Sequence, residues 1–172
     1  MLLPVIAPPP CTALLRFVTT KDSPLSEAIR FDEAGSVSHV EAVMQSGNII
    51  ASLIGEGVQE HPGDYDKTST MQIFVGIPML PPQYGKWQDF LVSKIGSPYD
   101  NLAIAAFATR FNLHERGALI CSALQVDALR HCGFFPVPLA QKYHQISPVV
   151  LLLMLQAQSR GRVFIHPPEI AK

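Results

Sequence analysis

Residues 118–126, Ala-Leu-Ile-Cys-Ser-Ala-Leu-Gln-Val, are the stretch around which the rest of this chain is organised. An apolar lead-in precedes a Cys-Ser pair, and from Cys121 onward the side chains follow a helical spacing of i, i+3, i+4 and i+7. Arg130 and His131 would lie in the last turn, where cations suit the helix dipole, and Gly133 follows as a C-terminal cap. The pattern predicts a helix that begins at or next to Cys121.

A cysteine at a helix start is a candidate nucleophile. Unpaired N–H groups and the positive end of the helix dipole favour thiolate over thiol. A nucleophilic cysteine needs that help, because an ordinary thiol is mostly protonated at neutral pH. We therefore expect Cys121 to have an activated thiol. The alternative is a buried structural cysteine, and we expect Cys132 on the same helix to be one.

The composition narrows the class of protein. With 172 residues, of which 48% are hydrophobic and 16% charged, one globular domain is expected. The net charge of −1 and the lack of a Lys/Arg cluster disfavour a nucleic-acid partner. The three cysteines form no Cys-x-x-Cys pair, which disfavours a zinc site and a disulfide framework and favours the reducing cytoplasm.

Two apolar segments bear on membranes. Residues 1–7 are short, lack a positive flank and run into three prolines, so they make a poor secretion signal. Residues 149–155 are the most hydrophobic stretch, but a transmembrane span needs about 20 residues. We predict a cytoplasmic protein with no transmembrane segment. Residues 147–157 are predicted to form a buried helix, which could also meet a membrane surface or a partner.

The remaining pattern predicts an α+β fold. Strands are predicted over residues 14–19, 37–44, 49–54 and 72–77, with a final edge strand over 162–165. A turn at 46–48 makes a hairpin of the second and third strands, Gly55 and Gly57 end it, and 61–68 is expected as a loop. Prolines at 78, 81 and 82 mark a break, and a helix is predicted over 87–95 with Trp87 in the core. A short helix or turn is predicted at 26–29 and a short helix at 102–108, and this arrangement favours α+β.

A catalytic thiol needs a base, and histidine is the usual one. His39 stands in the middle of a predicted strand, where it would be held rigidly. His131 lies about 15 Å along the helix from Cys121 and cannot serve. His39 is therefore the candidate base, although a hydrogen-bonded strand histidine would look the same. The other four histidines are less well placed: His61, His114, His144 and His166.

A catalytic imidazole is usually oriented by a third polar group. Glu41 is two residues from His39 and therefore on the same strand face. Ser52 lies on the predicted partner strand, near the point opposite His39. Either side chain could accept a hydrogen bond from the ring, and both also have ordinary surface interpretations.

The order of four motifs resembles a known family. Ser38-His39-Val40 comes first, then Gly-Glu-Gly-Val at 55–58, Gly-Ser-Pro-Tyr-Asp at 96–100 and Cys-Ser-Ala-Leu at 121–124. This order resembles the permuted branch of the NlpC/P60 superfamily of papain-like cysteine hydrolases. That branch includes bacterial YiiX/YaeF-type and poxvirus proteins and is related to lecithin:retinol acyltransferase-like enzymes. The resemblance covers about residues 14–135 of a single domain, 1–172, on which the helix at 147–157 would pack.

The resemblance implies a fold and roles for individual residues. The fold would be a circularly permuted papain-like domain, with an antiparallel sheet packed against helices and the nucleophile at a helix N-terminus. Cys121 would be the nucleophile and His39 the general base. Tyr99 would line the site near the thiolate, and Ser122 would contact the substrate beside it.

The third catalytic position departs from the family pattern. The residue that orients the histidine in the family falls by counting on Ala51 or Ser52, and Ala51 cannot orient a ring. This leaves Ser52 or Glu41 as substitutes, or a Cys-His dyad.

The implied reaction is acyl transfer through an acyl-enzyme. The first hypothesis is a cysteine peptidase or amidase, of bacterial or phage type, that acts on amide or peptide bonds, with cell-wall peptides as one substrate class. The second is a lipid acyltransferase or thioesterase-like enzyme with an acyl-lipid substrate. The third is a non-catalytic binding module that keeps the fold. No metal or other cofactor is expected, because no ligand cluster and no phosphate-binding glycine loop has the required spacing.

Overall fold

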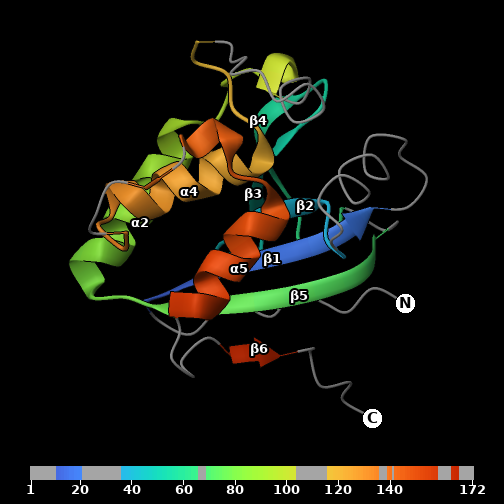
Figure 1. The fold of residues 1–172 in the computed structure, drawn as a ribbon. Helices are drawn as coiled ribbons and strands as arrows, with labels where there is room; N and C mark the ends of the chain where they lie inside the picture. Colours follow the sequence, from blue (N-terminus) through green and yellow to red (C-terminus); the bar gives the residue numbers. More distant parts are fainter. Residues whose placement is uncertain are drawn as a thin grey trace.

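A computed structural model describes residues 11–20, 36–65, 69–103, 116–135, 139–140, 142–158 and 164–166. Its strands form one sheet in the order β4-β3-β2-β1-β5-β6, and every neighbouring pair is antiparallel (Figure 1). The strand bounds are Thr12–Thr20 for β1, His39–Val43 for β2, Ile49–Leu53 for β3, Gly57–His61 for β4, Ser69–Pro78 for β5 and Phe164–His166 for β6.

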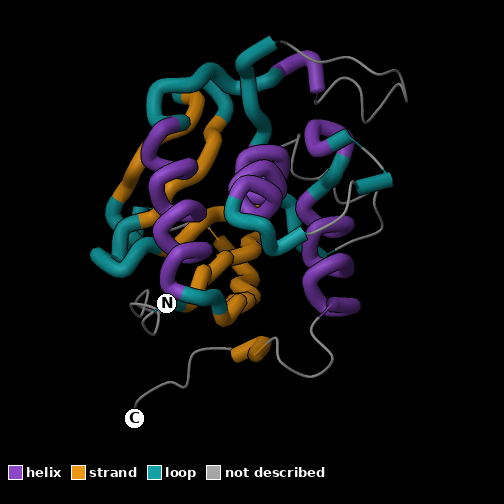
Figure 2. Tube along the Cα trace, turned by 90° about the vertical axis from the view of Figure 1, so that its left-hand side faces the viewer, coloured by secondary structure: helices purple, strands orange, loops and turns teal. Residues whose placement is uncertain are grey.

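Helices α2, α4 and α5 cover one face of this sheet (Figure 1). Their bounds are Pro81–Ser93 for α2, Cys121–His131 for α4 and Pro148–Gln158 for α5, and a 3₁₀ helix, η1, spans Tyr143–Gln145. The view in Figure 2 looks along α4, which lies between the other two helices. The prediction of an α+β fold with an antiparallel sheet packed against helices is confirmed.

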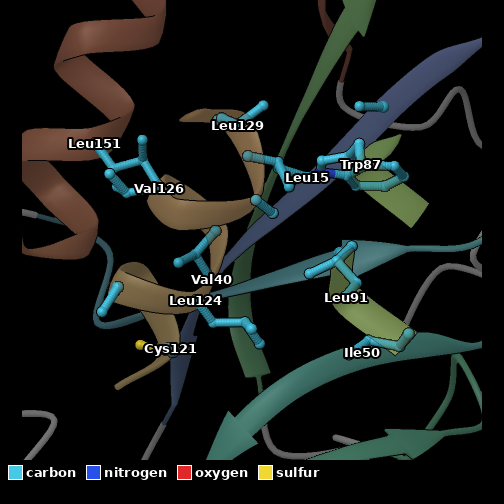
Figure 3. Packing of buried hydrophobic residues seen from close by; sticks show 14 of the residues in the cluster. Leu15, Val40, Ile50, Trp87, Leu91, Cys121, Leu124, Val126, Leu129 and Leu151 are labelled. Atoms are coloured by element: carbon cyan, nitrogen blue, oxygen red, sulfur yellow. The ribbon is translucent and has the colours of Figure 1, made fainter. Parts of the chain in front are cut away.

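Strand alternation divides the side chains between the two sheet faces. The helix-facing set, which includes Leu15, Val40 and Ile50, joins the main hydrophobic core with α4 and with Trp87 of α2 (Figure 3). The opposite face carries a smaller cluster of Val43, Ile49 and Phe74. Burying an aliphatic side chain of this size stabilises the fold by about 1.5–3 kcal/mol. As predicted, Trp87 is fully buried, and Cys132 is a core residue whose thiol donates to a backbone carbonyl.

The predicted strands appear as β1, β2, β3 and β5, and β6 forms the predicted edge strand. The predicted helices appear as α2 and α5. Helix α2 begins at Pro81, where a break was expected, because proline fits the first turn of a helix. The helix predicted at 26–29 lies outside the described residues, as does most of the one at 102–108.

The β2–β3 hairpin ends at Leu53, before the turn that holds Gly55, as expected, but the strand that follows this turn was not predicted. Residues Gly57–His61 form β4, which pairs with β3 from Leu53↔Gly57 to Ile49↔His61. This strand begins with a glycine and is mostly polar, so its own residues have little β-propensity. Pairing with β3 on one side is what makes it a strand.

Candidate active site

Strands β2 and β3 are paired next to the hairpin turn and separate at the ends farther from it. Their register runs through Ala42↔Ile50 and Val43↔Ile49, whereas β2 stays paired with β1 as far as Val18↔His39. The amide of Met44 donates to the carbonyl of Asn48 in the hairpin turn. Because every second N–H of an antiparallel strand points to the same neighbour, the N–H of Val40 also points toward the β3 side. Between His39 and Glu41, the edge of β2 that faces β3 is therefore available to another group.

The segment before α4 is held at this opening. The hydroxyl of Ser52 on β3 donates a buried hydrogen bond of 2.6 Å to the carbonyl of Leu119. The amide of Leu119 in turn donates to the carbonyl of Pro98 at 2.9 Å, and Leu119 forms an isolated β-bridge with Tyr99. The start of α4 is thus fixed between the sheet and the segment that carries Tyr99.

That second segment is itself attached to β4. The amide of Val58 donates to the carbonyl of Ser97 at 2.9 Å, and the amide of Gly96 donates to the carbonyl of Val58 at 2.9 Å. A Cβ at Gly57, which has φ +76°, would lie 2.2 Å from the carbonyl oxygen of Ser97. Glycine at this position allows the 96–100 segment to approach β4 closely.

Cys121 is the first residue of α4, and its thiol lies against the backbone of β2. Burial raises the pKa of the thiol most and the nearby carboxylate of Glu41 raises it further, whereas the N–H groups of Val40 and Ser122 interact with the thiol and lower its pKa. Burial is the largest effect, and the pKa is raised to about 11. Desolvation therefore opposes the thiolate that the helix start favours. Figure 3 shows Cys121 at the end of α4 that is close to Val40.

His39 and Glu41 flank the contact between the thiol and β2. Both are on the sheet face opposite Val40, and Nε2 of His39 lies 3.6 Å from Oε1 of Glu41. Glu41 is fully buried and His39 is 15% exposed. The distance is longer than a hydrogen bond, but such contacts commonly tighten when substrate binds.

Of the two candidates for orienting His39, Glu41 is the one whose carboxylate faces the ring. Ser52 instead donates its hydroxyl to Leu119, so its place in the structure is to hold the chain before Cys121. Continuing the β2–β3 register from Ala42↔Ile50 would set Ala51 opposite Glu41. The carboxylate that faces His39 thus comes from the strand of His39 itself.

Arg16 on β1 is a residue of this site that the sequence reasoning missed. Its Nε donates to Oε2 of Glu41 at 2.7 Å, its Nη2 lies 2.5 Å from the same oxygen, and its Nη1 donates to the carbonyl of Gly63 at 2.9 Å. The side chain is 2% exposed. Its position as the one charged residue in the apolar run 13–18 was the signal that could have revealed it, since buried charges are almost always paired.

Tyr99 and Ser122 lie beside the thiol. The pKa of Tyr99 is raised by burial, then by the charges of Cys121 and Asp100, which places its hydroxyl within electrostatic reach of Cys121. The hydroxyl of Ser122 is buried and has no hydrogen-bond partner within the described residues. Farther along α4, Gln125 donates to the carbonyl of Ile50 at 3.3 Å and so ties the helix to β3.

Other described histidines make contacts away from Cys121. His61 stacks on Tyr65 with ring centroids 4.5 Å apart and lies 3.3 Å from Glu56, while His131 packs against Phe90. All three cysteines are thiols rather than disulfides. Within the described ranges, no group of three or more His, Cys, Asp or Glu side chains could hold a metal ion.

Comparison with known proteins gives a likeness of fold. No family model matches the chain, and no curated protein matches it. The crystal structure of the metalloprotein yiiX from Escherichia coli O157:H7 (DUF1105) is similar, with a TM-score of 0.56 and 15% sequence identity over 92% of this chain and 89% of that chain. At this identity the likeness shows the fold alone. A YiiX-like fold was predicted and is confirmed, and the wider relation to NlpC/P60 and lecithin:retinol acyltransferase-like enzymes stays a prediction.

The helices of the structure are too short or too polar to cross a bilayer, as far as the described residues extend. Helix α5, the most apolar of them, has 11 residues.

Proposed function

We propose that this chain is a cysteine hydrolase that cleaves amide or peptide bonds through an acyl-enzyme on Cys121, in a circularly permuted papain-like domain. The observation that carries the proposal is the contact between the thiol of Cys121 and the amide of Val40. Val40 stands between His39, the proposed base, and Glu41, whose carboxylate faces the His39 ring and acts electrostatically on the thiol.

The resting thiol is protonated, so its proton must leave as it reacts. His39 accepts the thiol proton while Sγ of Cys121 attacks the carbonyl carbon of the substrate. The protonated His39 then gives this proton to the nitrogen of the leaving group as the carbon–nitrogen bond breaks. In the second half, His39 takes a proton from water, whose oxygen attacks the thioester, and the thiol is restored with the acid product.

The start of α4 supplies groups for the negative charge that forms on the substrate oxygen. Its N-cap is Ile120, and no side chain caps the helix. The first N–H groups of a helix lack intrahelical partners, so here they remain available to an oxyanion next to the nucleophile. Glu41 would hold the imidazole with its other nitrogen directed at the thiol, the role that a third residue has in cysteine and serine hydrolases.

A metal-based alternative has less support in this chain. The yiiX protein, which has a similar fold, is a metalloprotein. Here the described residues include no group of three suitable ligands, and Oε2 of Glu41 is already bound by Arg16. These residues do not fit a metal centre, and no step of the proposed reaction passes through one.

Acyl esters of apolar chains are a second substrate class for the same chemistry. Leu102 is 47% exposed only three residues after Tyr99, and Leu119 and Tyr99 join the apolar core around Cys121. Apolar surface beside the nucleophile would favour an acyl chain or an apolar peptide side chain.

Hydrolysis assays with chromogenic peptide anilides and acyl esters test the proposal. Turnover should disappear in Cys121→Ala and His39→Ala, while both variants remain folded. Cys132→Ala is the matched control, because it removes a buried thiol from the same helix and should retain activity. Equal activity in Cys121→Ala and the wild type would refute the proposal.

A further inference from the structure

The carboxylate of Glu41 bridges two basic side chains. Its Oε2 accepts from Arg16, at 2.7 Å from Nε, whereas its Oε1 faces Nε2 of His39 at 3.6 Å. The two oxygens are therefore used separately, one for each partner. Because Arg16 binds Oε2 through a rigid planar group, it fixes the plane of the carboxylate and with it the direction of Oε1.

Burial makes this arrangement necessary. Glu41 is fully buried and Arg16 is 2% exposed, so neither charge is hydrated in the ordinary way. Removing one partner of such a pair leaves an uncompensated charge in a poorly solvated place. Without Arg16, Glu41 would tend to bind a proton and could no longer present a charged oxygen to His39.

Arg16 also contacts the connection that follows β4. Its Nη1 donates to the carbonyl of Gly63 at 2.9 Å. Tyr65 in the same turn packs against Val43, Ile49 and Phe74 on the sheet face that carries Glu41. The 62–65 turn thus lies over this face and helps to hold the guanidinium in place from the side opposite the helices.

We propose that Arg16 is a positioning residue of the site: by binding Oε2 of Glu41 it keeps this carboxylate charged and directs Oε1 at His39. The inference rests on the proposed function, in which His39 is the base. Arg16 has no contact with the reacting atoms and acts through Glu41. A purely structural ion pair would stabilise the fold without affecting the protonation of His39.

The protonation of His39 distinguishes these two roles. Glu41 faces His39 from its own strand, and Glu41 in turn binds Arg16 on β1 and lies within electrostatic reach of Cys121 at the start of α4. The 62–65 turn adds Asp64, which is exposed, and Tyr65. Loss of the Arg16 cation raises the proton affinity of the His39–Glu41 pair as a unit, wherever the proton resides. Loss of both Arg16 and Glu41 removes the anion that is nearer to His39 and lowers that affinity.

Nuclear magnetic resonance titration of the His39 ring and the Glu41 carboxyl in the full chain gives the midpoint at which the pair takes up its proton. In Arg16→Met the midpoint should move to higher pH by about one unit, a tenfold change in the protonation equilibrium. In the double variant Arg16→Met/Glu41→Gln it should move below the wild-type midpoint. Arg16→Lys keeps the charge and should stay near the wild type. The surface change Arg130→Met, which breaks only an exposed pair with Asp127, is the control and should have no effect.

The outcomes separate the inference from the proposed function. A wild-type midpoint in folded Arg16→Met would overturn the positioning role. If Arg16→Met does not fold, the double variant Arg16→Met/Glu41→Gln decides, because it removes both charges together. A wild-type midpoint in the double variant would also overturn the positioning role. Neither measurement needs a substrate. Activity that persists in Cys121→Ala would refute the hydrolase proposal and leave the titration result standing.

Discussion

The hydroxyl of Ser52 donates a hydrogen bond of 2.6 Å to the carbonyl of Leu119, a residue 67 positions later in the chain. Leu119 lies two residues before Cys121. Both groups are buried. This bond joins β3 to the chain that enters α4, at the point where β3 has left β2. It therefore helps to set how closely the thiol approaches Val40.

Replacing Ser52 by alanine should affect stability and the site together. The carbonyl of Leu119 would lose a buried partner, which costs about 1–3 kcal/mol of the free energy of unfolding. Acylation of Cys121 should slow at the same time, because the start of α4 would be held less firmly. Urea unfolding and acylation rates measure the two effects. Ser93→Ala removes an exposed hydroxyl hydrogen bond to Phe90 and should change neither.

Gly57 should tolerate alanine far less well than Gly55. Both have positive φ, +76° and +83°, which costs an alanine about 1–2 kcal/mol. Only at Gly57 would the new Cβ also meet the carbonyl of Ser97, at 2.2 Å, whereas at Gly55 it would meet nothing within 4 Å. Gly57→Ala should therefore lower the free energy of unfolding by clearly more than Gly55→Ala. Equal losses in urea unfolding would show that the close approach of β4 to the 96–100 segment is not tight.

The thiol of Cys121 should react slowly at neutral pH in the absence of substrate. Its pKa of about 11 means that the reactive thiolate is scarce near pH 7. Its alkylation by iodoacetamide, followed by mass spectrometry of the Cys121 peptide, should accelerate about tenfold for each pH unit up to pH 10. A plateau below pH 8 would instead indicate an activated thiolate in the resting protein.

The same pKa predicts a loss of stability in alkali. Between the ordinary value of 9.0 and about 11, the unfolded thiol has lost its proton while the folded thiol retains it. The folded state then binds more protons, so the free energy of unfolding falls as pH rises through this window, by about 2–3 kcal/mol in total. Because other groups titrate there too, the difference between wild type and Cys121→Ser isolates the contribution. From pH 9 to pH 11 the free energy of unfolding should fall further in the wild type than in Cys121→Ser. An equal fall in both proteins would contradict the prediction.

Periodicity predicted the parts of this fold that local pattern controls. The alternation of His39, Val40 and Glu41 predicted that the histidine and the carboxylate share one face of the sheet. The helical spacing after Cys121 predicted where α4 begins. Strand β4 was missed because its sequence alone does not favour a strand, and its pairing with β3 decides its structure.

The site itself depended on features that pattern does not reveal. Ser52 was expected near His39 on the assumption of a continuous hairpin, but the β2–β3 register extends only as far as Ala42↔Ile50 among the described residues, and Ser52 binds Leu119. Backbone N–H groups, including that of Ser122 at the helix start, favour a Cys121 thiolate, but burial has the larger opposite effect on its pKa. Burial of this kind depends on the packing of distant segments.

Trapping of the acyl-enzyme tests the central claim most directly. The wild-type protein and His39→Ala would be exposed briefly to an activated acyl ester, quenched in acid and examined by peptide mass spectrometry. We expect acylation of the peptide that carries Cys121, slower in His39→Ala by about 10²–10⁴-fold, as is usual for loss of a general base. Acylation at equal rates in both proteins, or none on Cys121 while the substrate is turned over, would contradict the proposed mechanism.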